Sequence, residues 1–388
     1  MKRSRAATCI ALAAALLAAA TLTAKGDEVG VSEDAILFGQ AAALEGPSSV
    51  LGQRMRQGIV AAFTEINAKG GVHGRKLQLI SRDDGYDPDR SLVQTLRLIE
   101  DDKVFALIGA VGTATAMATI PITNARDVPF IGPLSGAELL RDLELTNVVN
   151  IRPSYGAEAE TLIKHLTEDR HFTRIAIFYQ DDSFGRDGLT GVKTALAKRG
   201  LELAAEGTFE RNTRVVGAAW RTIKRAEPEA IVMVGTYGPS AEFIKLARRS
   251  GVSPTFVNIS FVGATALAKE LGPDGEGVVV AQVVPFPWDR SIKLVADYQA
   301  AQKAFDPTLT PDFVSLEGYL SARLAAAALE KAGPNPTRAG LLRAINDTGR
   351  FDISGSIVTV GVRAIEAPPK VFLTVIQKDG SFKAIDRL

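Results

Sequence analysis

The chain has 388 residues, of which 45 are Lys or Arg and 44 are Asp or Glu, so its formal net charge is +1. This balance, without a basic stripe or an acidic tail, argues against a nucleic-acid partner. The length favours two domains.

The first 24 residues are typical of a secretory signal peptide. Three basic side chains lie within residues 1–5, an apolar run covers 6–20, and small residues lead to Ala24. That order of segments marks a cleaved leader, and the run is shorter than the about 20 residues that span a membrane. We expect cleavage after Ala24 or after Ala20, with a retained N-terminal anchor as the alternative.

Cysteine usage limits the chemistry of the mature chain. Cys9 is the only cysteine, and it precedes most of the apolar run, so we expect no lipid anchor. Cleavage leaves 364 residues with no cysteine, which excludes a disulfide framework, a thiolate metal site and a cysteine nucleophile. A large hydrophobic core must therefore hold the mature protein together.

Short apolar runs alternate with amphipathic stretches in the first half of the chain. Asp87 can cap a helix that has Pro88 at its first position, and the pair Gly70 and Gly71 suits the end of the helix before it. The pattern predicts strands at 35–42, 76–81, 105–109 and 128–132, and helices at 55–67, 88–100 and 113–126.

A second series of the same kind begins after Arg152. It predicts strands at 174–179, 206–209, 230–234, 255–259 and 277–282, and helices at 157–168, 185–199, 215–226 and 240–249. Continuous apolar strands that alternate with helices indicate parallel sheets covered on both faces. The sequence therefore predicts an α/β protein with two doubly wound parallel-sheet lobes.

The last hundred residues break the alternation. Helices are predicted at 291–305, 315–331 and 337–346, followed by a strand at 371–377 and a turn at 378–381. Since no low-complexity linker separates the two series, we expect several short crossings between the lobes.

Several local motifs together resemble a known family. The segment 65–75, Glu-Ile-Asn-Ala-Lys-Gly-Gly-Val-His-Gly-Arg, is the most specific, with Asp83-Asp84 and Asp87-Pro88 after it. Weaker matches are 45–47 with Gly52, 108–109 with 113–115, and 179–185. On these residues the chain resembles the type I periplasmic solute-binding proteins of branched-chain amino acid ABC importers, the leucine/isoleucine/valine-binding kind.

The resemblance implies a fold and a set of partners. It implies two lobes joined by three hinge crossings, with residues 25–152 and 287–350 in the first lobe and 153–286 and 351–388 in the second. A small-molecule ligand would be held in the cleft between the lobes, and the closed form would be read by an ABC permease in the cytoplasmic membrane. We expect a periplasmic monomer without a cofactor, a metal site, a nucleic-acid partner or enzymatic activity.

Ligands of open α/β sheets lie beyond the carboxyl ends of the strands. This rule selects the loops 45–52, 109–115, 133–136, 180–185 and 235–238, and Ser260. Within them, the resemblance implies these ligand-binding residues: Gly112, Thr113, Thr115, Leu134, Ser135, Phe184, Tyr237, Ser260 and Leu51.

Two segments are candidates for holding a carboxylate. Residues 112–115 open a helix, whose free N–H groups and positive end suit an anion, with the Thr113 hydroxyl as a further donor. The alternative role of Thr113 is an ordinary helix cap. Leu134-Ser135-Gly136 aligns with the second half of the family's grip, with Gly136 where a hydroxyl is expected and Ser135 beside it. Ser135 could equally be a simple cap.

Two aromatic residues line up with those that close over the ligand in the family. Phe184 could instead be a core aromatic, whereas the segment 236–239 around Tyr237 predicts an exposed turn. Leu51 falls where the family often has an aromatic residue, and it would narrow the pocket or be unrelated to it.

Ser260 departs from the family pattern. The resemblance implies a carboxylate at this position, paired with the ammonium group of an amino acid. A buried ammonium without an anion is costly. Either Glu45, Asp181 or Asp182 replaces that acid, or the ligand is not an amino acid. Asp181 and Asp182 could also be a solvated pair or a cap for the next helix.

Motifs of enzymes are absent from the sequence. There is no dinucleotide fingerprint, phosphate loop or nucleophile elbow, and the three histidines lack zinc spacing. The first hypothesis is therefore the binding component of an importer for a small carboxylate-bearing solute, such as a branched-chain amino acid, a related amino acid or an amide. The alternatives are a ligand sensor of the same fold and an importer component for a non-amino-acid organic or aromatic acid. A secreted enzyme is the least supported hypothesis.

Overall fold

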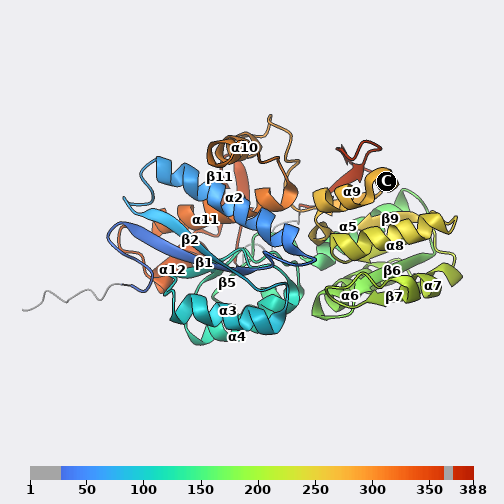
Figure 1. Cartoon of the computed structure of the whole chain (residues 1–388), viewed down its shortest axis with the longest axis horizontal. Helices are drawn as coiled ribbons and strands as arrows, with labels where there is room; N and C mark the ends of the chain where they lie inside the picture. The colour runs from blue at the N-terminus through green and yellow to red at the C-terminus, as the bar shows by residue number, and fades with distance from the viewer. Residues whose placement is uncertain (1–27, 362–369) are drawn as a thin grey trace, which may run out of the picture.

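The computed structural model describes residues 28–361 and 370–388, so the predicted signal peptide lies outside the described residues. Two lobes lie side by side along the long axis of the molecule (Figure 1). Each lobe has a mostly parallel sheet with helices on both faces; the parallel strands were predicted, and the second sheet also contains two antiparallel strands. No helix in the described ranges is both long and apolar enough to cross a membrane.

The first lobe contains an all-parallel sheet with the strand order β2-β1-β3-β4-β5. Its strands are β1 (Ala35–Ala42), β2 (Lys76–Asp83), β3 (Ala106–Ile108), β4 (Phe130–Ile131) and β5 (Val148–Val149). The intervening helices are α2 (Ser49–Ala68), α3 (Pro88–Glu100), α4 (Thr113–Ala125) and the 3-10 turn η1 (Glu138–Arg141).

The second lobe contains a seven-stranded sheet with the order β14-β13-β10-β9-β8-β6-β7. Five strands are parallel: β6 (Ile175–Gln180), β7 (Ala205–Phe209), β8 (Ala230–Val234), β9 (Thr255–Asn258) and β10 (Val279–Gln282). β13 (Phe372–Ile376) and β14 (Phe382–Ile385) are added antiparallel. The helical elements are α5 (Tyr155–Glu168), α6 (Ser183–Ala197), α7 (Gly217–Arg225), α8 (Tyr237–Arg249), η2 (Ser260–Val262), α9 (Ala264–Leu271) and η3 (Gly272–Gly275).

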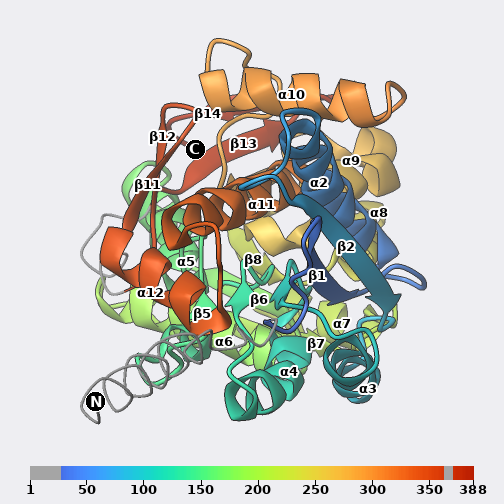
Figure 2. The ribbon, with the colours of Figure 1, turned by 90° about the vertical axis from the view of Figure 1, so that its left-hand side faces the viewer.

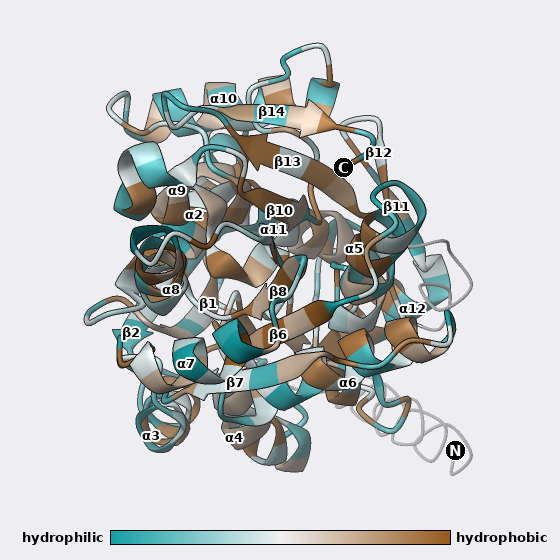
Figure 3. Ribbon diagram, turned by 90° about the vertical axis from the view of Figure 1, so that its right-hand side faces the viewer, coloured by the Kyte–Doolittle hydropathy of each residue, from teal (hydrophilic) through white to brown (hydrophobic). Residues whose placement is uncertain are grey.

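The second sheet is the core of its lobe. All residues of β6 and β8 are buried, and Figure 3 shows hydrophobic strands beneath helices of mixed polarity. Burial on both faces explains why these strands read as continuous apolar runs in the sequence.

The helices that follow return to the first lobe (Figure 2). They are α10 (Lys293–Phe305), α11 (Phe313–Ala332) and α12 (Arg338–Thr348), and the hairpin β11 (Arg350–Ile353) and β12 (Ser356–Thr359) lies beside α11. α11 and α2 are in backbone contact, because a Cβ atom on Gly58 would lie 1.8 Å from the carbonyl oxygen of Ser315. A Cβ atom on Gly318 would lie 2.2 Å from the carbonyl oxygen of Met55. Only glycine fits this crossing.

Two crossings between the lobes are described, residues 150–154 and 283–292, while the stretch between β12 and β13 includes residues 362–369, outside the described residues. In the second crossing, Trp288 stacks on Phe382 of β14, with ring centroids 5.7 Å apart and an interplanar angle of 16°. It also meets the ring of Phe313 in α11 edge-on, at 5.5 Å. Trp288 therefore contacts one element of each lobe.

Most predicted elements are present, and some begin elsewhere. β1 and β8 match their predicted ranges, and Asp87 caps α3 by accepting the N–H of Arg90 at 3.0 Å. The turn predicted at 236–239 is wrong, because α8 begins at Tyr237 and Pro239 lies in its first turn, where a missing N–H costs little. The short elements β5, β11, β12, β14 and α9 were not predicted.

The predicted lobe boundaries remain a prediction. β13 and β14 join the second sheet, whereas β11 and β12 form their own two-stranded sheet next to α11. The sequence analysis placed residues 351–388 in the second lobe, and that assignment stays a prediction.

Candidate ligand-binding cleft

The loops at the carboxyl ends of the two parallel sheets face each other and touch. The Val50 N–H donates to the Tyr237 hydroxyl at 3.4 Å, and the Gln180 side chain donates to the Tyr86 hydroxyl at 3.3 Å. Asn212 donates to the carbonyl oxygen of Gly85 at 3.1 Å. The carboxyl ends of parallel strands are where such sheets bind ligands, so this seam is the candidate cleft, with the lobes closed on each other.

In the first lobe, the start of α4 and the loop after β4 form one wall of the cleft. Gly112 caps α4 with φ of 107°, and a Cβ atom there would lie 2.6 Å from the Tyr86 ring. The hydroxyl oxygens of Thr113 and Ser135 lie 2.8 Å apart, and both residues are buried. The wall therefore combines a helix N-terminus with a pair of hydroxyl groups.

Two other predicted residues hold this wall in shape. The Thr115 hydroxyl donates within its own turn, to the carbonyl oxygens of Val111 at 2.5 Å and Gly112 at 3.0 Å. The Leu134 carbonyl accepts from Gly112 N at 3.1 Å, and its N–H donates to Ala110 at 2.7 Å. These bonds fasten the loops after β3 and β4 to each other.

Four rings meet at the seam and form what we name the aromatic cluster: Tyr86, Tyr155, Phe184 and Phe261. Phe261 is central, with ring centroids 4.6 Å from Phe184, 6.1 Å from Tyr86 and 6.4 Å from Tyr155. Tyr155 and Phe184 are 5.3 Å apart. Only Tyr86 comes from the first lobe, so the cluster joins the lobes through flat apolar surfaces.

Residues of the second lobe surround Tyr86. The guanidinium carbon of Arg211 lies 5.7 Å from the centre of its ring, a distance suited to a cation–π contact. Arg211 pairs with Asp182 at 2.7 Å, and Asp182 caps α6 by accepting from Phe184 N at 2.9 Å. Burial, with the nearby Asp182 carboxylate, raises the pKa of Tyr86 well above its ordinary value, so its hydroxyl stays protonated.

Ser260 belongs to a buried ionic network. Its N–H and hydroxyl donate to the Glu158 carboxylate at 2.7 and 3.0 Å, and its hydroxyl accepts from Arg152. Arg152 also pairs with Glu158 at 3.2 Å and with Glu317 at 3.4 Å. We name Arg152, Glu158 and Glu317 the Arg152 cluster; it joins the first crossing, α5 of the second lobe and α11 of the first.

Burial and charge set the protonation of this region. Burial lowers the pKa of Arg152, but Glu317 and Glu158 outweigh burial and raise it. Burial raises the pKa of Glu317 to about 6, although Arg152 opposes the rise. Burial likewise raises the pKa of Tyr155 to about 12. Arg152 is therefore a permanent buried cation next to Ser260.

Leu51 and Tyr237 lie on opposite sides of the seam. Leu51, in α2, is buried, and a Cβ atom on Gly263 of the second lobe would lie 2.7 Å from its Cδ2 atom. Tyr237 is also buried, with 4% of its surface exposed, which contradicts the expected exposed turn. The two lobes approach within van der Waals contact here.

Three acids, Glu45, Asp181 and Asp182, were considered as replacements for the carboxylate that the resemblance implies at position 260. Glu45 is exposed, and Asp181 is exposed and pairs with Arg186 at 2.8 Å. Asp182 caps the N-terminus of α6, which is one of the two alternative roles that the sequence analysis gave to Asp181 and Asp182. None of the three approaches Ser260 in any described contact; the acid beside Ser260 is Glu158.

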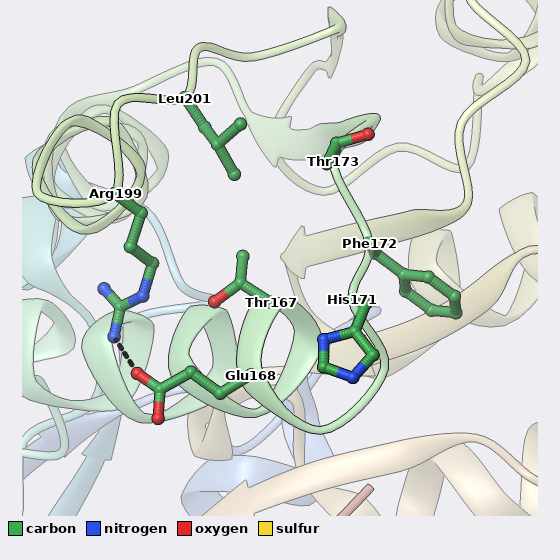
Figure 4. A pocket seen from close by; sticks show the side chains of 7 residues that line it. All are labelled: Thr167, Glu168, His171, Phe172, Thr173, Arg199 and Leu201. Atoms are coloured by element: carbon green, nitrogen blue, oxygen red, sulfur yellow. Dashed lines mark hydrogen bonds and ion pairs between the residues drawn. The ribbon is translucent and has the colours of Figure 1, made fainter.

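A surface hollow of about 500 Å³ lies elsewhere, lined by residues between Thr167 and Leu201 (Figure 4). It lies beside the C-terminal ends of α5 and α6, which lead into the amino ends of β6 and β7. The hollow is thus at the opposite edge of the sheet from the cleft, and it does not contain any predicted site residue.

Sequence reasoning missed several residues that build the cleft. Tyr86 follows β2 directly, so the rule of strand ends could have selected it. Phe261 follows Ser260, which that rule did select. Nothing local indicates Arg152, Glu158 and Glu317, whose association depends on the tertiary fold. The ligand-binding roles of all nine predicted residues remain predictions.

Asp84, beneath Tyr86, should make stability depend on pH. It is buried and accepts Tyr86 N at 2.8 Å, and burial raises its pKa from 3.8 to about 7. The native state then holds a proton that the unfolded chain releases, so its stabilisation is complete below about pH 4 and is lost as the pH rises through about 7.

We expect Asp84→Asn to remove this dependence. The free energy of unfolding, measured in urea at pH 5 and pH 8, should fall with pH in the native chain relative to the variant. The fall should be up to about 3 kcal/mol, because about two pKa units lie between pH 5 and the folded pKa of about 7, at about 1.4 kcal/mol per unit. Other groups titrate in both proteins and cancel in the comparison. A difference that stays constant over this range would show that Asp84 is ionised throughout.

Gly263→Ala should hold the lobes apart. The new methyl group would meet Leu51, and Gly251→Ala is a matched control because its φ of 76° is close to the 77° of Gly263 while nothing lies within 4 Å. Both variants carry the strain of a left-handed alanine. Only Gly263→Ala should increase the radius of gyration in small-angle X-ray scattering; equal radii would show that the contact with Leu51 does not limit closure.

Comparisons with known proteins agree with this architecture. A family model described as periplasmic binding protein matches residues 35–372. The Leu/Ile/Val-binding protein homolog 7 of Brucella abortus is 26% identical over 256 residues; the match covers 64% of this chain and 62%, less than two thirds, of that protein. The Leu/Ile/Val-binding protein BraC3 of Rhizobium johnstonii is 24% identical over 347 residues, covering 88% of this chain and 92% of that one.

A solved structure extends the likeness to the whole fold. The crystal structure of a possible leucine/isoleucine/valine-binding protein from Rhodopirellula baltica matches with a TM-score of 0.85 and 36% identity. The match covers 93% of this chain and 98% of that one. The chain belongs to the type I periplasmic binding proteins of the branched-chain amino acid family.

Proposed function

We propose that this protein is the substrate-binding component of an ABC importer. It captures a small carboxylate-bearing solute in the periplasm by hinge closure and delivers it to a permease in the cytoplasmic membrane. The observation that carries the proposal is the seam itself: a helix N-terminus and paired hydroxyl groups lie buried where the carboxyl ends of two parallel sheets meet.

The wall formed by α4 suits a carboxylate. The first N–H groups of a helix have no acceptor in the preceding turn, and the helix dipole is positive at this end. The hydroxyl groups of Thr113 and Ser135, which now bond to each other, can both donate to an anion placed between them and the helix.

Closure can couple binding to recognition by a permease. The contacts of Tyr237 with Val50 and of Gln180 with Tyr86 join different lobes, so separation of the lobes would break them. A ligand that touches both lobes shifts the population toward that form. The permease then needs to recognise only the closed arrangement.

The binding step is tested by thermal denaturation of the cleaved protein with a panel of small carboxylic acids, amino acids and amides. A ligand present at a hundred times its dissociation constant stabilises the folded state by about 2.7 kcal/mol, which gives a clear rise in Tm. If no member of the panel raises the Tm, the proposed ligand class is wrong.

Thr113→Val should weaken binding of any ligand found in this way. Loss of a hydroxyl donor to a buried charged group costs about 1.5 to 3 kcal/mol, or roughly ten- to a hundredfold in affinity. Thr119→Val is the matched control, since Thr119 is buried in the same helix and bonds to Thr95 at 3.2 Å and to the Thr115 carbonyl at 3.0 Å, away from the seam. Equal affinities of the two variants, measured by calorimetry, would remove Thr113 from the site.

The transport step separates an importer from a sensor of the same fold. Deletion of the gene should abolish uptake of the radiolabelled ligand by whole cells, and the wild-type gene should restore it. Thr113→Val should restore it only at higher ligand concentration, because capture is weaker. Full uptake in the deletion strain would favour the sensor.

A further inference from the structure

The hydroxyl group of Tyr155 is buried at the seam without a hydrogen bond. Tyr155 is 0% exposed, and its hydroxyl oxygen has no hydrogen-bond partner among the described residues. Burial of a hydroxyl group that forms no hydrogen bond costs free energy, so such groups are rare in native proteins and each needs an explanation. A ligand that accepts the hydrogen of this group is one such explanation.

The ring of Tyr155 is held in place by the backbone and by the aromatic cluster. Tyr155 is the first residue of α5, and its N–H donates to the carbonyl oxygen of Gly136 at 2.7 Å. A Cβ atom on Gly136 would lie 2.6 Å from the Cδ1 atom of Tyr155. The ring centroids of Phe184 and Phe261 lie 5.3 and 6.4 Å from that of Tyr155. The ring is therefore fixed against the loop that contains Ser135.

This position brings the Tyr155 hydroxyl to the paired hydroxyl groups of the cleft. It lies near the Ser135 hydroxyl but is not placed to form a hydrogen bond with it. Ser135 has other partners, because its hydroxyl oxygen lies 2.8 Å from that of Thr113 and accepts Ala137 N at 3.2 Å. Two hydroxyl groups of the first lobe and one from the start of the second thus gather at the wall formed by α4.

Donors outnumber acceptors at this wall. Each hydroxyl group carries one hydrogen atom. The bond between Thr113 and Ser135 uses one of their two hydrogens, so the other one and that of Tyr155 have no acceptor in any described contact. Burial raises the pKa of Tyr155 to about 12, so its hydroxyl group stays protonated at neutral pH. An ionised carboxylate has only acceptors and can satisfy all three groups.

We infer that Tyr155 is a ligand-binding residue, whose hydroxyl group donates a hydrogen bond to the same carboxylate that Thr113 and Ser135 bind. The inference rests on the proposed function and adds to that site a residue that the sequence analysis did not select. Tyr155 directly follows the first crossing, residues 150–154. A carboxylate bound to all three residues would therefore join the wall of the first lobe to the hinge end of the second, which favours the closed form.

Tyr155→Phe tests the inference, because it removes the hydroxyl oxygen and keeps the ring. Tyr298→Phe is the matched control. Tyr298 is also 0% exposed, but its hydroxyl accepts Asp312 N at 2.9 Å and lies 2.5 Å from that of Ser315, between α10 and α11. The Tyr298 hydroxyl group therefore has partners of its own, away from the seam.

Binding is measured by isothermal calorimetry of the cleaved protein with leucine, phenylalanine and 4-methylpentanoate as probes. We expect Tyr155→Phe to bind the probes that the native protein binds about ten- to a hundredfold more weakly, because a donor to a buried charged group is lost. Tyr298→Phe should bind them as the native protein does. If Tyr155→Phe binds as tightly as the native protein, the inference is wrong while the proposed function stands.

The stability of the ligand-free proteins gives a second result, which does not depend on the ligand. Tyr155→Phe removes a hydroxyl group without a partner, so its Tm should equal or exceed that of the native protein. Tyr298→Phe leaves the N–H of Asp312 without its acceptor and should lower the Tm. An equal fall in both variants would show that the Tyr155 hydroxyl already has a partner inside the protein, against the inference.

A double-mutant cycle with Ser135→Ala separates direct contact from an effect through Ser135. If Tyr155 touches the ligand, Tyr155→Phe should still weaken binding by about tenfold in the Ser135→Ala background. Disappearance of the effect there would make Tyr155 a positioning residue for Ser135 and would overturn the inference. If none of the three probes binds the native protein at millimolar concentration, the carboxylate class of the proposed function is contradicted, and the inference falls with it.

Discussion

The guanidinium group of Arg152 is the point at which both lobes and the first crossing are tied together. Arg152 lies in the crossing itself, where it pairs with Glu158 of α5 and Glu317 of α11. It also donates a hydrogen bond to Ser260, which follows β9 in the chain. The removal of one partner from such a buried network leaves an uncompensated charge and is strongly destabilising. The direction in which the chain leaves the first lobe is therefore constrained by charge as well as by packing.

Two short segments, 152–158 and 260–261, supply both polar groups of the buried network and rings of the aromatic cluster. Tyr155 lies three residues after Arg152 and three before Glu158, and Phe261 follows Ser260. Because they are so close in sequence to the ionic groups, these rings lie beside them at the seam, where Phe184 and Tyr86 complete the cluster. Shape and charge at the cleft thus have a common structural origin, which explains why a cation lies so close to an apolar surface.

Much of the fold could be predicted from the sequence because the signals for its longer elements are local. β1 and β8 are continuous apolar runs, and the boundary of α3 follows from Asp87 and Pro88, so pattern and capping rules find them. β4 and β5 are two residues long and carry no periodicity of their own. Their pairing depends on neighbours in the sheet, and β5 was accordingly missed.

The site was predicted only in outline for a related reason. Strand ends selected the loops that contain Thr113, Ser135, Phe184 and Ser260, and all of these lie buried at or near the seam. The partners of Ser260 could not be found, because Glu158 is 102 residues away and nothing in its helical segment distinguishes it from a surface acid. Buried ion pairs that join distant segments become visible only in the folded chain.

The aromatic packing of the second crossing has a practical consequence for spectroscopy. The chain has two tryptophans, and Trp220 is 4% exposed in the core of the second lobe, against the ring of Phe243. Trp288 is 37% exposed and lies between β14 of one lobe and α11 of the other. If the lobes move as proposed, the surroundings of Trp288 would change because it contacts both lobes, whereas those of Trp220 lie within one lobe. Trp288 would then report on lobe movement by its fluorescence, with Trp220 as an internal reference.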